Sequence, residues 1–228
     1  MSGRKSIREG LRCMKFKVKA VIFDLDGVIC STDKFHYQAW KSLADDLGIL
    51  FNEEINHRLR GVSRMDSLNI ILERADREYT LEEKTRLAEE KNRIYRQLLE
   101  TMTRADLSEE VWTTLQKLRE KGYQLAIGSS SKNAKLILER LELGSFFDAV
   151  ADGTDIMQSK PAPEVFLCAA KKLGVEPEKC AVIEDAKVGI EAAKAGGMTA
   201  LALFGDARGC GMEDYDLRSF ADLLNVME

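Results

Sequence analysis

Five short apolar runs alternate with helical patterns along this chain, and that alternation is the strongest limit on its fold. The first run, residues 21–23, follows a stretch in which apolar residues alternate with lysines, as in a strand that begins half-exposed and ends buried. The four later runs are residues 125–127, 147–151, 181–183 and 199–203. Because strands that alternate with helices form parallel sheets with right-handed crossovers, we expect one parallel sheet.

Helical spacing fills the segments between these runs, and a glycine follows each helical pattern. Val111, Leu115 and Leu118 recur at helical intervals, and Gly122 follows as a stop signal. Similar patterns precede Gly144, Gly174 and Gly196. The chain therefore predicts an α/β fold, with a Rossmann-like core in which helices flank the parallel sheet.

Residues 32–103 break this rhythm, because they hold no convincing strand and are helical and rich in charge. Leu87, Ile94 and Leu98 supply an apolar stripe that would face a core. A helical insertion directly after the first strand would cover the carboxyl edge of the sheet, where α/β proteins bind ligands. We therefore expect three parts: a flexible N-terminal extension at 1–14, a discontinuous core domain at 15–31 and 104–228, and an all-helical cap domain at 32–103.

The composition excludes several classes of protein. A net charge of −4 argues against nucleic acid as the main partner, because binding to a phosphate backbone needs a basic face. No apolar run approaches the roughly 20 residues that span a membrane, so we expect no membrane partner. The 5 cysteines are scattered without a C-x-x-C pair, which indicates reduced thiols in a cytoplasmic protein. Nothing in the sequence indicates a large exposed interface, so we expect a monomer.

Two carboxylates, Asp24 and Asp26, directly follow the first strand, with Gly27 after them. Residues i and i+2 leave a strand on the same side, so both carboxylates can face one pocket. One carboxylate could attack phosphorus while the other moves a proton. An ordinary loop and a fragment of a calcium-binding loop are the competing interpretations. The calcium loop requires a downstream glutamate, and Asp33 or Phe35 stands at that position.

Suitable polar residues also follow the later strands. Three serines at 129–131 follow the second strand and could hold a phosphate, although they could also cap the next helix. Lys160 lies after the third strand, where a lone lysine is usually exposed to solvent. Glu184 and Asp185 follow the fourth strand and suit Mg²⁺, although a turn with a helix cap would use the same residues. Because these places share one edge of one sheet, together they predict a site for magnesium-dependent phosphoryl transfer.

Four motifs, in this order, resemble the signatures of the haloacid dehalogenase superfamily of phosphotransferases. They are DLDGV (24–28), SSSKN (129–133), SKPAPEVF (159–166) and IEDAKVGI (183–190). Within that superfamily the chain looks closest to the β-phosphoglucomutases, from about residue 15 to residue 203. The phrases FHYQAW (35–40), RGVSRMDSL (60–68) and EEKNRIY (89–95) resemble the cap of those enzymes. The resemblance implies the superfamily's α/β core with an inserted helical cap.

The resemblance also implies a role for each matching core residue. Asp24 would be the nucleophile that becomes phosphorylated, and Asp26 would be the general acid and base. The ligands implied for Mg²⁺ are Asp24, the backbone carbonyl of Asp26, and Asp185, with Glu184 beside the metal. Ser129 and Lys160 would hold the transferring phosphate. The second, non-transferring phosphate would be held by Arg64, Ser131, Lys132 and Asn133.

In the cap and its hinge the resemblance implies four further site residues. Thr32 would lie at the hinge, and His36 would couple to the general acid and base, although a buried core histidine is the simpler interpretation of its helix. Lys91 would lie near the sugar. Arg60 would also face the substrate, and it stands where the best-known mutases carry lysine. Because arginine is wider than lysine and binds anions in a bidentate way, this departure leaves the preferred sugar open.

The resemblance implies a mutase that interconverts β-glucose 1-phosphate and glucose 6-phosphate through an aspartyl-phosphate. β-Glucose 1,6-bisphosphate would be its primer and intermediate. The alternative is a phosphatase that hydrolyses a small phosphorylated sugar, because both activities share the core motifs. A non-catalytic sensor of sugar phosphates is a third hypothesis. It is disfavoured because Asp24, Asp26, Lys160 and Asp185 are all retained.

Overall fold

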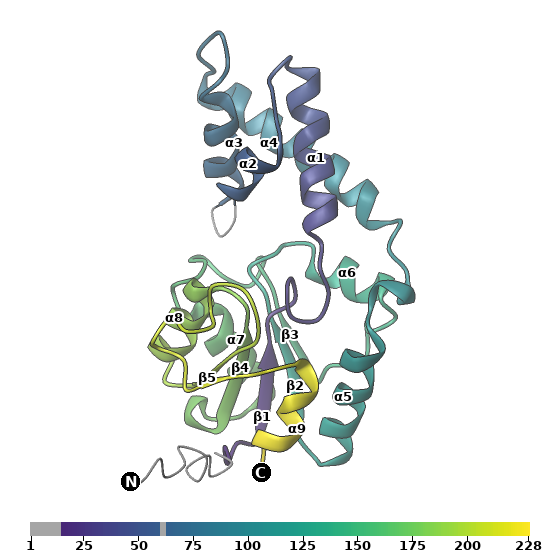
Figure 1. Ribbon diagram of the computed structural model, residues 1–228, viewed down its shortest axis with the longest axis vertical. Helices are drawn as coiled ribbons and strands as arrows, with labels where there is room; N and C mark the ends of the chain where they lie inside the picture. Colours follow the sequence, from purple (N-terminus) through teal and green to yellow (C-terminus); the bar gives the residue numbers. More distant parts are fainter. Residues whose placement is uncertain (1–14, 60–62) are drawn as a thin grey trace, which may run out of the picture.

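Six parallel strands form one sheet in the larger lobe of the computed structural model, which describes residues 15–59 and 63–228 (Figure 1). The strands lie in the order β3-β2-β1-β4-β5-β6, so the chain extends the sheet first to one side of β1 and then to the other. Their bounds are β1 Ala20–Phe23, β2 Gln124–Gly128, β3 Ala149–Ala151, β4 Cys180–Glu184, β5 Thr199–Ala202 and β6 Tyr215–Asp216. The carboxyl end of β1 is therefore the topological switch point, where open α/β sheets bind ligands.

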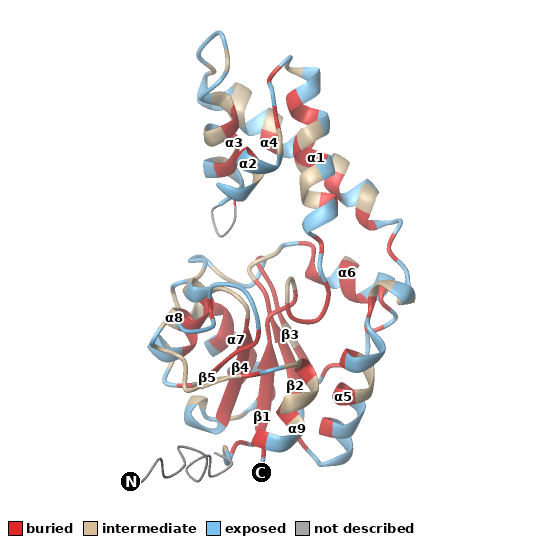
Figure 2. Ribbon diagram, in the orientation of Figure 1, coloured by how far each residue is buried: buried red, intermediate tan, exposed pale blue. Residues whose placement is uncertain are grey.

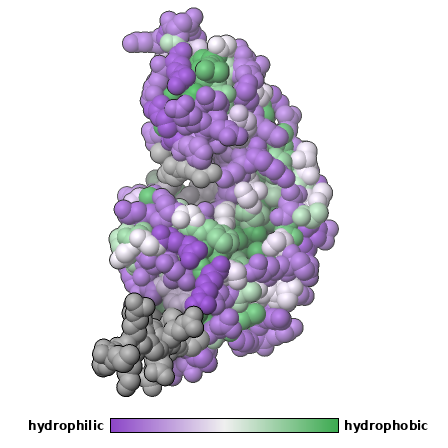
Figure 3. Space-filling view, viewed as in Figure 1, coloured by the Kyte–Doolittle hydropathy of each residue, from purple (hydrophilic) through white to green (hydrophobic). Residues whose placement is uncertain are grey.

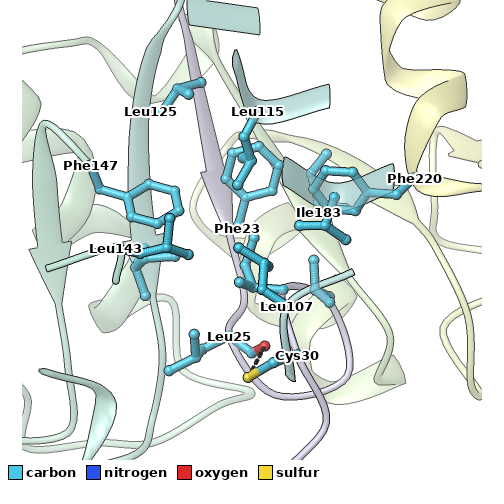
Figure 4. Packing of buried hydrophobic residues seen from close by; sticks show 14 of the residues in the cluster. Phe23, Leu25, Cys30, Leu107, Leu115, Leu125, Leu143, Phe147, Ile183 and Phe220 are labelled. Atoms are coloured by element: carbon cyan, nitrogen blue, oxygen red, sulfur yellow. Dashed lines mark hydrogen bonds between the residues drawn. The ribbon is translucent and has the colours of Figure 1, made fainter. Parts of the chain in front are cut away.

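Helices cover both faces of this sheet, because successive strand residues point to opposite sides. Val21 and Phe23 pack into one apolar cluster with residues of α5 and α6, and Figure 4 shows part of that cluster around Phe23. Ala20 and Ile22 belong to a second cluster, with residues of α7 and α8. The bounds are η1 Arg104–Asp106, α5 Glu109–Glu120, α6 Ala134–Arg140, α7 Glu164–Leu173, η2 Pro177–Lys179, α8 Lys187–Ala195, η3 Phe220–Asp222 and α9 Leu223–Val226. The sheet is thus a buried middle layer (Figure 2), as its continuous apolar strands require.

The α/β fold and the five expected strands are confirmed, with two differences in detail. The alternating stretch before residue 20 does not extend β1, and Phe16 makes only an isolated bridge to Met227. The registers of β2 and β4 with β1 begin at Ala20, and Lys19 still makes one backbone hydrogen bond on each side of the sheet, whereas Phe16 is bonded to the C-terminal segment. The sixth strand, β6, was not expected, because two residues are too few to give an apolar pattern.

A second lobe is formed by four helices that follow β1 in the chain, and we call it the cap lobe (Figure 1). Its helices are α1 Asp33–Asp46, α2 Glu53–His57, α3 Arg64–Leu72 and α4 Leu81–Leu99. The lobe has an apolar cluster of its own, which includes Trp40, Phe51 and Leu68. A lobe with a separate core can keep its shape while its angle to the sheet changes.

Helix α4 links the cap lobe back to the sheet, and its buried face differs from the expected stripe. Leu87, Ile94 and Leu98 are only partly buried. The buried positions of the helix are Ala88, Lys91, Tyr95 and Leu99. The apolar pattern thus located the helix but displaced its buried face by one residue, because two of the buried side chains carry polar groups.

The surface of the described chain is largely hydrophilic on the face shown in Figure 3. Among the described residues the large apolar side chains that are exposed are Leu50, Leu81, Met157, Leu167 and Phe204. No helix within the described ranges is both long and apolar enough to cross a membrane. The N-terminal extension expected at 1–14 lies outside the described residues.

Leu115 tests the packing of α5 on the sheet, because it is 0% exposed and belongs to the larger cluster. Replacing Leu115 with alanine should lower the free energy of unfolding by about 2–5 kcal/mol, since it removes buried methyl groups and leaves a cavity. Urea denaturation followed by circular dichroism measures this loss. Leu81→Ala is the matched control at a residue that is 74% exposed, and it should change the free energy by less than about 0.5 kcal/mol. Equal losses in the two variants would contradict this account of the core.

Candidate active site

Asp24 lies at the carboxyl end of β1, between the ends of two neighbouring strands. Phe23, the residue before it, pairs with β2 on one side and with β4 on the other, so Asp24 lies level with Gly128 and Glu184. Asp24 is 7% exposed and Glu184 is 1% exposed. Two carboxylates buried this close together need a cation between them, because an unpaired buried charge is strongly destabilising.

Lys160 supplies that cation. Its Nζ donates hydrogen bonds to Asp24 Oδ1 and to Glu184 Oε1. The ring of Phe166 on α7 lies against the ammonium, with 4.6 Å between Nζ and the ring centroid. Gly128 leaves room for this ring, since a Cβ there would lie 2.6 Å from it. The Lys160 side chain is 9% exposed, so it lies inside the site and not in solvent.

The charges of this group act on the pKa values of Asp24 and Lys160. Burial raises the pKa of Asp24, the Lys160 ammonium opposes that rise, and the charge of Glu184 adds to it. Burial by itself would lower the pKa of Lys160, but the charges of Asp24 and Glu184 outweigh it and raise that pKa. Lys160 is therefore protonated at neutral pH and can neutralise the oxygens of a transferring phosphoryl group.

Glu184 is held in place from both sides of its carboxylate. While Oε1 accepts from Lys160, Oε2 accepts from the backbone N–H of Asp185 at 2.9 Å and of Ala186 at 3.0 Å. Gly189 on α8 makes room for this carboxylate, because a Cβ there would lie 2.0 Å from its carbon. The start of α8 thus orients Glu184, and Glu184 in turn orients Lys160.

Asp185 completes a group of acids that suits a metal ion. Asp24, Glu184 and Asp185 each offer one carboxylate oxygen, and these atoms lie within 4.8 Å of one another. Gly27, at a φ of +90°, lets the backbone approach, because a Cβ there would lie 2.1 Å from Asp185 Oδ2. Burial and the charge of Glu184 raise the pKa of Asp185 to about 7. Three carboxylates against the single Lys160 ammonium leave an excess of negative charge, which fits a divalent ion that prefers oxygen ligands, such as Mg²⁺.

Asp26 is turned toward the start of α1. Its Oδ1 accepts from the Thr32 backbone N–H at 2.7 Å, and its Oδ2 accepts from the Thr32 hydroxyl at 2.6 Å. The Thr32 hydroxyl oxygen accepts in turn from the Tyr95 hydroxyl of α4 at 3.0 Å. Burial raises the pKa of Asp26, although the two bonds from Thr32 oppose the rise. A partly buried carboxyl group with a raised pKa is suited to general acid and base work.

His36 and Lys91 meet inside the cap lobe. Lys91 Nζ lies 2.8 Å from His36 Nδ1, and the His36 ring stacks on the Tyr95 ring with 4.1 Å between centroids. Burial lowers the pKa of Lys91 to about 7, and burial together with the Lys91 charge lowers the pKa of His36 to about 3. His36 is therefore neutral at physiological pH, and its Nδ1 forms a hydrogen bond with Lys91 Nζ. In this arrangement it contacts Lys91, while Asp26 is bonded to Thr32.

The serines after β2 shape the loop on which they lie. Ser129 is 3% exposed, and its hydroxyl accepts from the backbone N–H of Ser131 at 3.2 Å. The Ser131 hydroxyl accepts from the backbone N–H of Asn133, also at 3.2 Å. Helix α6 begins only at Ala134, and its N-cap residue, Asn133, makes no side-chain cap. Ser131 therefore caps the turn at 132–133 that leads into α6 and not the first residue of the helix itself, and Lys132 is exposed.

Of the two arginines expected to face the substrate from the cap lobe, the structure describes Arg64 but not Arg60. Arg64 is the first residue of α3, and it follows Ser63, whose hydroxyl accepts from the Asp66 backbone N–H at 3.2 Å. Burial lowers the pKa of Arg64, and the charge of Arg64 lowers the pKa of Lys91. Arg64 thus lies near the Lys91 and His36 pair. Arg60 lies outside the described residues.

Three residues that hold site residues in place were not predicted from the sequence: Tyr95, Phe166 and Gly189. Each lies within a motif that was noted, but only its neighbours were given a role. Tyr95 donates to Thr32, Phe166 lies against Lys160, and Gly189 makes room for Glu184. The signal of the two aromatic residues is weak, because aromatic residues are common in any helix that packs on a core. Gly189 gave a clearer signal, because glycine is disfavoured inside a helix and marks a close approach of another group.

Comparison with known proteins identifies the family, because residues 18–197 match the family model of the haloacid dehalogenase-like hydrolases. The chain belongs to this family. It is 43% identical to the β-phosphoglucomutase of Bacillus subtilis, over 82% of this chain and 83% of that protein. It is 34% identical to the phosphorylated carbohydrates phosphatase of Thermotoga maritima, over 79% of this chain and 82% of that protein. The crystal structure of a β-phosphoglucomutase from Clostridium difficile matches it with a TM-score of 0.80 at 36% identity, over 90% of this chain and 93% of that chain.

Membership in the haloacid dehalogenase-like hydrolases makes this protein an enzyme that acts on phosphoryl groups. The resemblance to β-phosphoglucomutases is confirmed by the relatives from Bacillus subtilis and Clostridium difficile. A phosphatase also stands among the similar proteins, so the family alone does not choose between transfer to a sugar and transfer to water.

Lys91 allows a test of the charges in the cap lobe. Its pKa of about 7 in the folded protein lies below the ordinary value of 10.5, because burial disfavours the charged form. Between these two pH values the unfolded chain binds a proton that the folded chain does not. The free energy of unfolding should therefore rise with pH in this window, by at most about 1.4 kcal/mol per pH unit. Lys91→Met removes this contribution, so the wild type should gain more stability than the variant between pH 7 and pH 9 in urea denaturation.

Lys117→Met is the control for this measurement, because Lys117 is exposed on α5. The free energy of unfolding of the Lys117→Met variant should change with pH in the same way as that of the wild type. Parallel curves for the wild type and Lys91→Met would show that Lys91 does not titrate in this window.

Proposed function

We propose that this protein is a mutase that interconverts β-glucose 1-phosphate and glucose 6-phosphate. The observation that carries the proposal is the buried group of Asp24, Lys160 and Glu184, to which the cap lobe adds the basic side chains of Arg64 and Lys91, themselves close to each other. One set of charges suits a transferring phosphate, and the other suits the far end of a phosphorylated sugar. The names of the relatives from Bacillus subtilis and Clostridium difficile support this choice.

The first half of the reaction would begin with phosphate on Asp24. The 6-hydroxyl oxygen of β-glucose 1-phosphate attacks phosphorus, the bond from phosphorus to the Asp24 oxygen breaks, and Asp26 takes the hydroxyl proton. The products are β-glucose 1,6-bisphosphate and a free Asp24 carboxylate. Ser129 and Lys160 hold the oxygens of the phosphoryl group as it moves, which is most of what phosphoryl transfer requires of a protein.

The second half would begin when the bisphosphate has reversed its orientation in the site, so that its other phosphate faces Asp24. The Asp24 carboxylate attacks the phosphorus on C1, the bond from that phosphorus to the sugar oxygen breaks, and Asp26 returns its proton to that oxygen. Glucose 6-phosphate leaves, and Asp24 is phosphorylated again. A bisphosphate that binds both ways round needs a second phosphate subsite, for which we propose Arg64, Ser131, Lys132 and Asn133.

The position of Asp26 suggests how water is kept from the phosphorylated enzyme. Both of its carboxylate oxygens are bonded to Thr32, at the point where the chain enters the cap lobe. While these bonds hold, Asp26 is not available to activate water near Asp24. We propose that closure of the cap lobe on a sugar releases Asp26 from Thr32 and brings His36 toward it.

Mg²⁺ fits the proposed chemistry as well as the acids present. Asp24, Asp185 and the backbone carbonyl of Asp26 would hold it, with Glu184 beside it. When bound it would neutralise charge on the transferring phosphoryl group. The three clustered carboxylates and the close approach allowed by Gly27 support this assignment.

A phosphatase for a small phosphorylated sugar is the second candidate, and the relative from Thermotoga maritima favours it. Water would then take the phosphoryl group in place of the sugar hydroxyl, with the same Asp24 intermediate.

We propose that the protein acts as a monomer in the cytoplasm. The four cysteines in the described part of the chain form no disulfide, which agrees with a reducing compartment.

The mutase and the phosphatase differ in their product. With β-glucose 1-phosphate, Mg²⁺ and a trace of β-glucose 1,6-bisphosphate, we expect full conversion to glucose 6-phosphate, measured by coupling to glucose 6-phosphate dehydrogenase. The α anomer should react far more slowly, and chelation of Mg²⁺ by EDTA should abolish turnover. Inorganic phosphate as the main product would refute the mutase and support the phosphatase.

Arg64 separates the two activities because it is proposed to hold the phosphate that is not transferred. Arg64→Ala should lower kcat/KM for the mutase reaction about 100-fold, since charge-assisted hydrogen bonds to phosphate are lost. Hydrolysis of p-nitrophenyl phosphate, which carries one phosphate, should fall by less than about 3-fold. Arg86→Ala, at an exposed arginine of α4, is the control and should leave both rates unchanged. Equal losses in the two assays of Arg64→Ala would remove Arg64 from the second subsite.

A further inference from the structure

Helix α4 of the cap lobe touches the loop after β2 through a pair of hydrogen bonds. Arg96 Nη1 donates to Asn133 Oδ1 at 3.0 Å, and Asn133 Nδ2 donates to Asn92 Oδ1 at 3.2 Å. Asn92 and Arg96 are four residues apart on α4, so they lie on one face of the helix. Asn133 is 4% exposed, and both ends of its amide are thus held by the cap lobe.

These bonds determine which way the Asn133 amide points. Asn92 and Asn133 could both turn over and still keep a hydrogen bond between them, because each amide is a donor at one end and an acceptor at the other. Arg96 removes this freedom, since a guanidinium donates and cannot accept. Oδ1 of Asn133 must therefore face Arg96, and Nδ2 must lie on the other side.

The orientation matters because an amide nitrogen carries two hydrogens. One hydrogen of Asn133 Nδ2 goes to Asn92, and within the described residues no acceptor is found for the other. A phosphate oxygen is a suitable acceptor for that N–H. A reversed amide would present its carbonyl oxygen to the anion, which is a repulsive contact.

We propose that Arg96 is a positioning residue of the second phosphate subsite, which acts by holding the Asn133 amide with its N–H toward the phosphate. This inference rests on the proposed function, in which Asn133 contacts the non-transferring phosphate. Arg96 also brings a positive charge beside the loop that carries Lys132. Because Arg96 belongs to the cap lobe and Asn133 to the loop after β2, the contact links the subsite to the position of the cap lobe.

Arg93 gives a matched control on the same helix. It is exposed, and its guanidinium is bonded to Glu90 and Gln97 of α4 itself, with Nε to Glu90 Oε2 at 2.9 Å and Nη1 to Gln97 Oε1 at 3.1 Å. Replacing Arg93 removes the same charge and the same side chain from α4 without touching Asn133.

The test is the dissociation constant of β-glucose 1,6-bisphosphate in the presence of Mg²⁺, measured by isothermal titration calorimetry. The full-length chain carries Asp24→Asn, which blocks transfer, and is the parent for each variant. Arg96→Ala should raise the dissociation constant about 10-fold, while Arg93→Ala should change it by less than about 2-fold. Arg96→Lys keeps a charged group that only donates, so it should recover part of the lost affinity. This variant also provides the test if Arg96→Ala does not fold.

A double variant separates positioning from direct contact. If Arg96 acts through Asn133, Arg96→Ala should have little further effect once Asn133 is alanine. The inference is overturned if Arg96→Ala binds as tightly as the parent, if the two losses add, or if the parent does not bind the bisphosphate. Bisphosphate binding that depends on Arg96 in a protein whose wild type makes no glucose 6-phosphate would refute the mutase and leave the role of Arg96 standing.

Discussion

The ammonium of Lys160, buried between the carboxylates of Asp24 and Glu184, is the interaction on which the rest of the site depends. Neither carboxylate could be buried at the end of its strand without it, because a buried charge needs a partner. The surrounding fold serves this contact. The sheet order sets β1 beside β4, α7 supplies the ring of Phe166, and the first backbone amides before α8 hold the far side of Glu184.

The cap lobe is built differently, because the buried face of α4 carries polar groups. Lys91 and Tyr95 occupy positions on α4 that an ordinary core would fill with leucine. Lys91 contacts His36, while the Tyr95 hydroxyl donates to Thr32, whose hydroxyl donates in turn to Asp26. Polar groups at buried helix positions reduce apolar packing. Such departures from the usual apolar pattern are expected mainly at functional sites. The proposed mutase would use this network to govern when Asp26 can exchange a proton.

Much of the core could be predicted from the sequence, for a physical reason. Strands of a parallel sheet are buried on both faces and appear as continuous apolar runs, so Asp24, Ser129 and Glu184 were recognised as the residues that follow such runs. Lys160 was found by its place after a strand, although nothing in its own surroundings marked it as buried. The cap lobe was harder, because periodicity reports apolar faces and could not show that Lys91 lies on one. Arg96 was missed, since an exposed arginine on a charged helix gives no signal of its own.

The sequence by itself determined the order along the chain of the first five strands and the helices between them, the place of the helical insertion, and the residue types available at the ends of those strands. These follow from local patterns, which depend on neighbours along the chain. Only the tertiary structure decided which of those residues meet. It joined Lys160 to Asp24, turned Asp26 toward Thr32, and brought Arg96 to Asn133. Contacts between residues far apart in the chain depend on the packing of whole helices and strands, and no local pattern encodes that packing. Asp24 and Asp26 are separated in the sequence only by Leu25, yet Asp24 is bonded to Lys160 and Asp26 to Thr32.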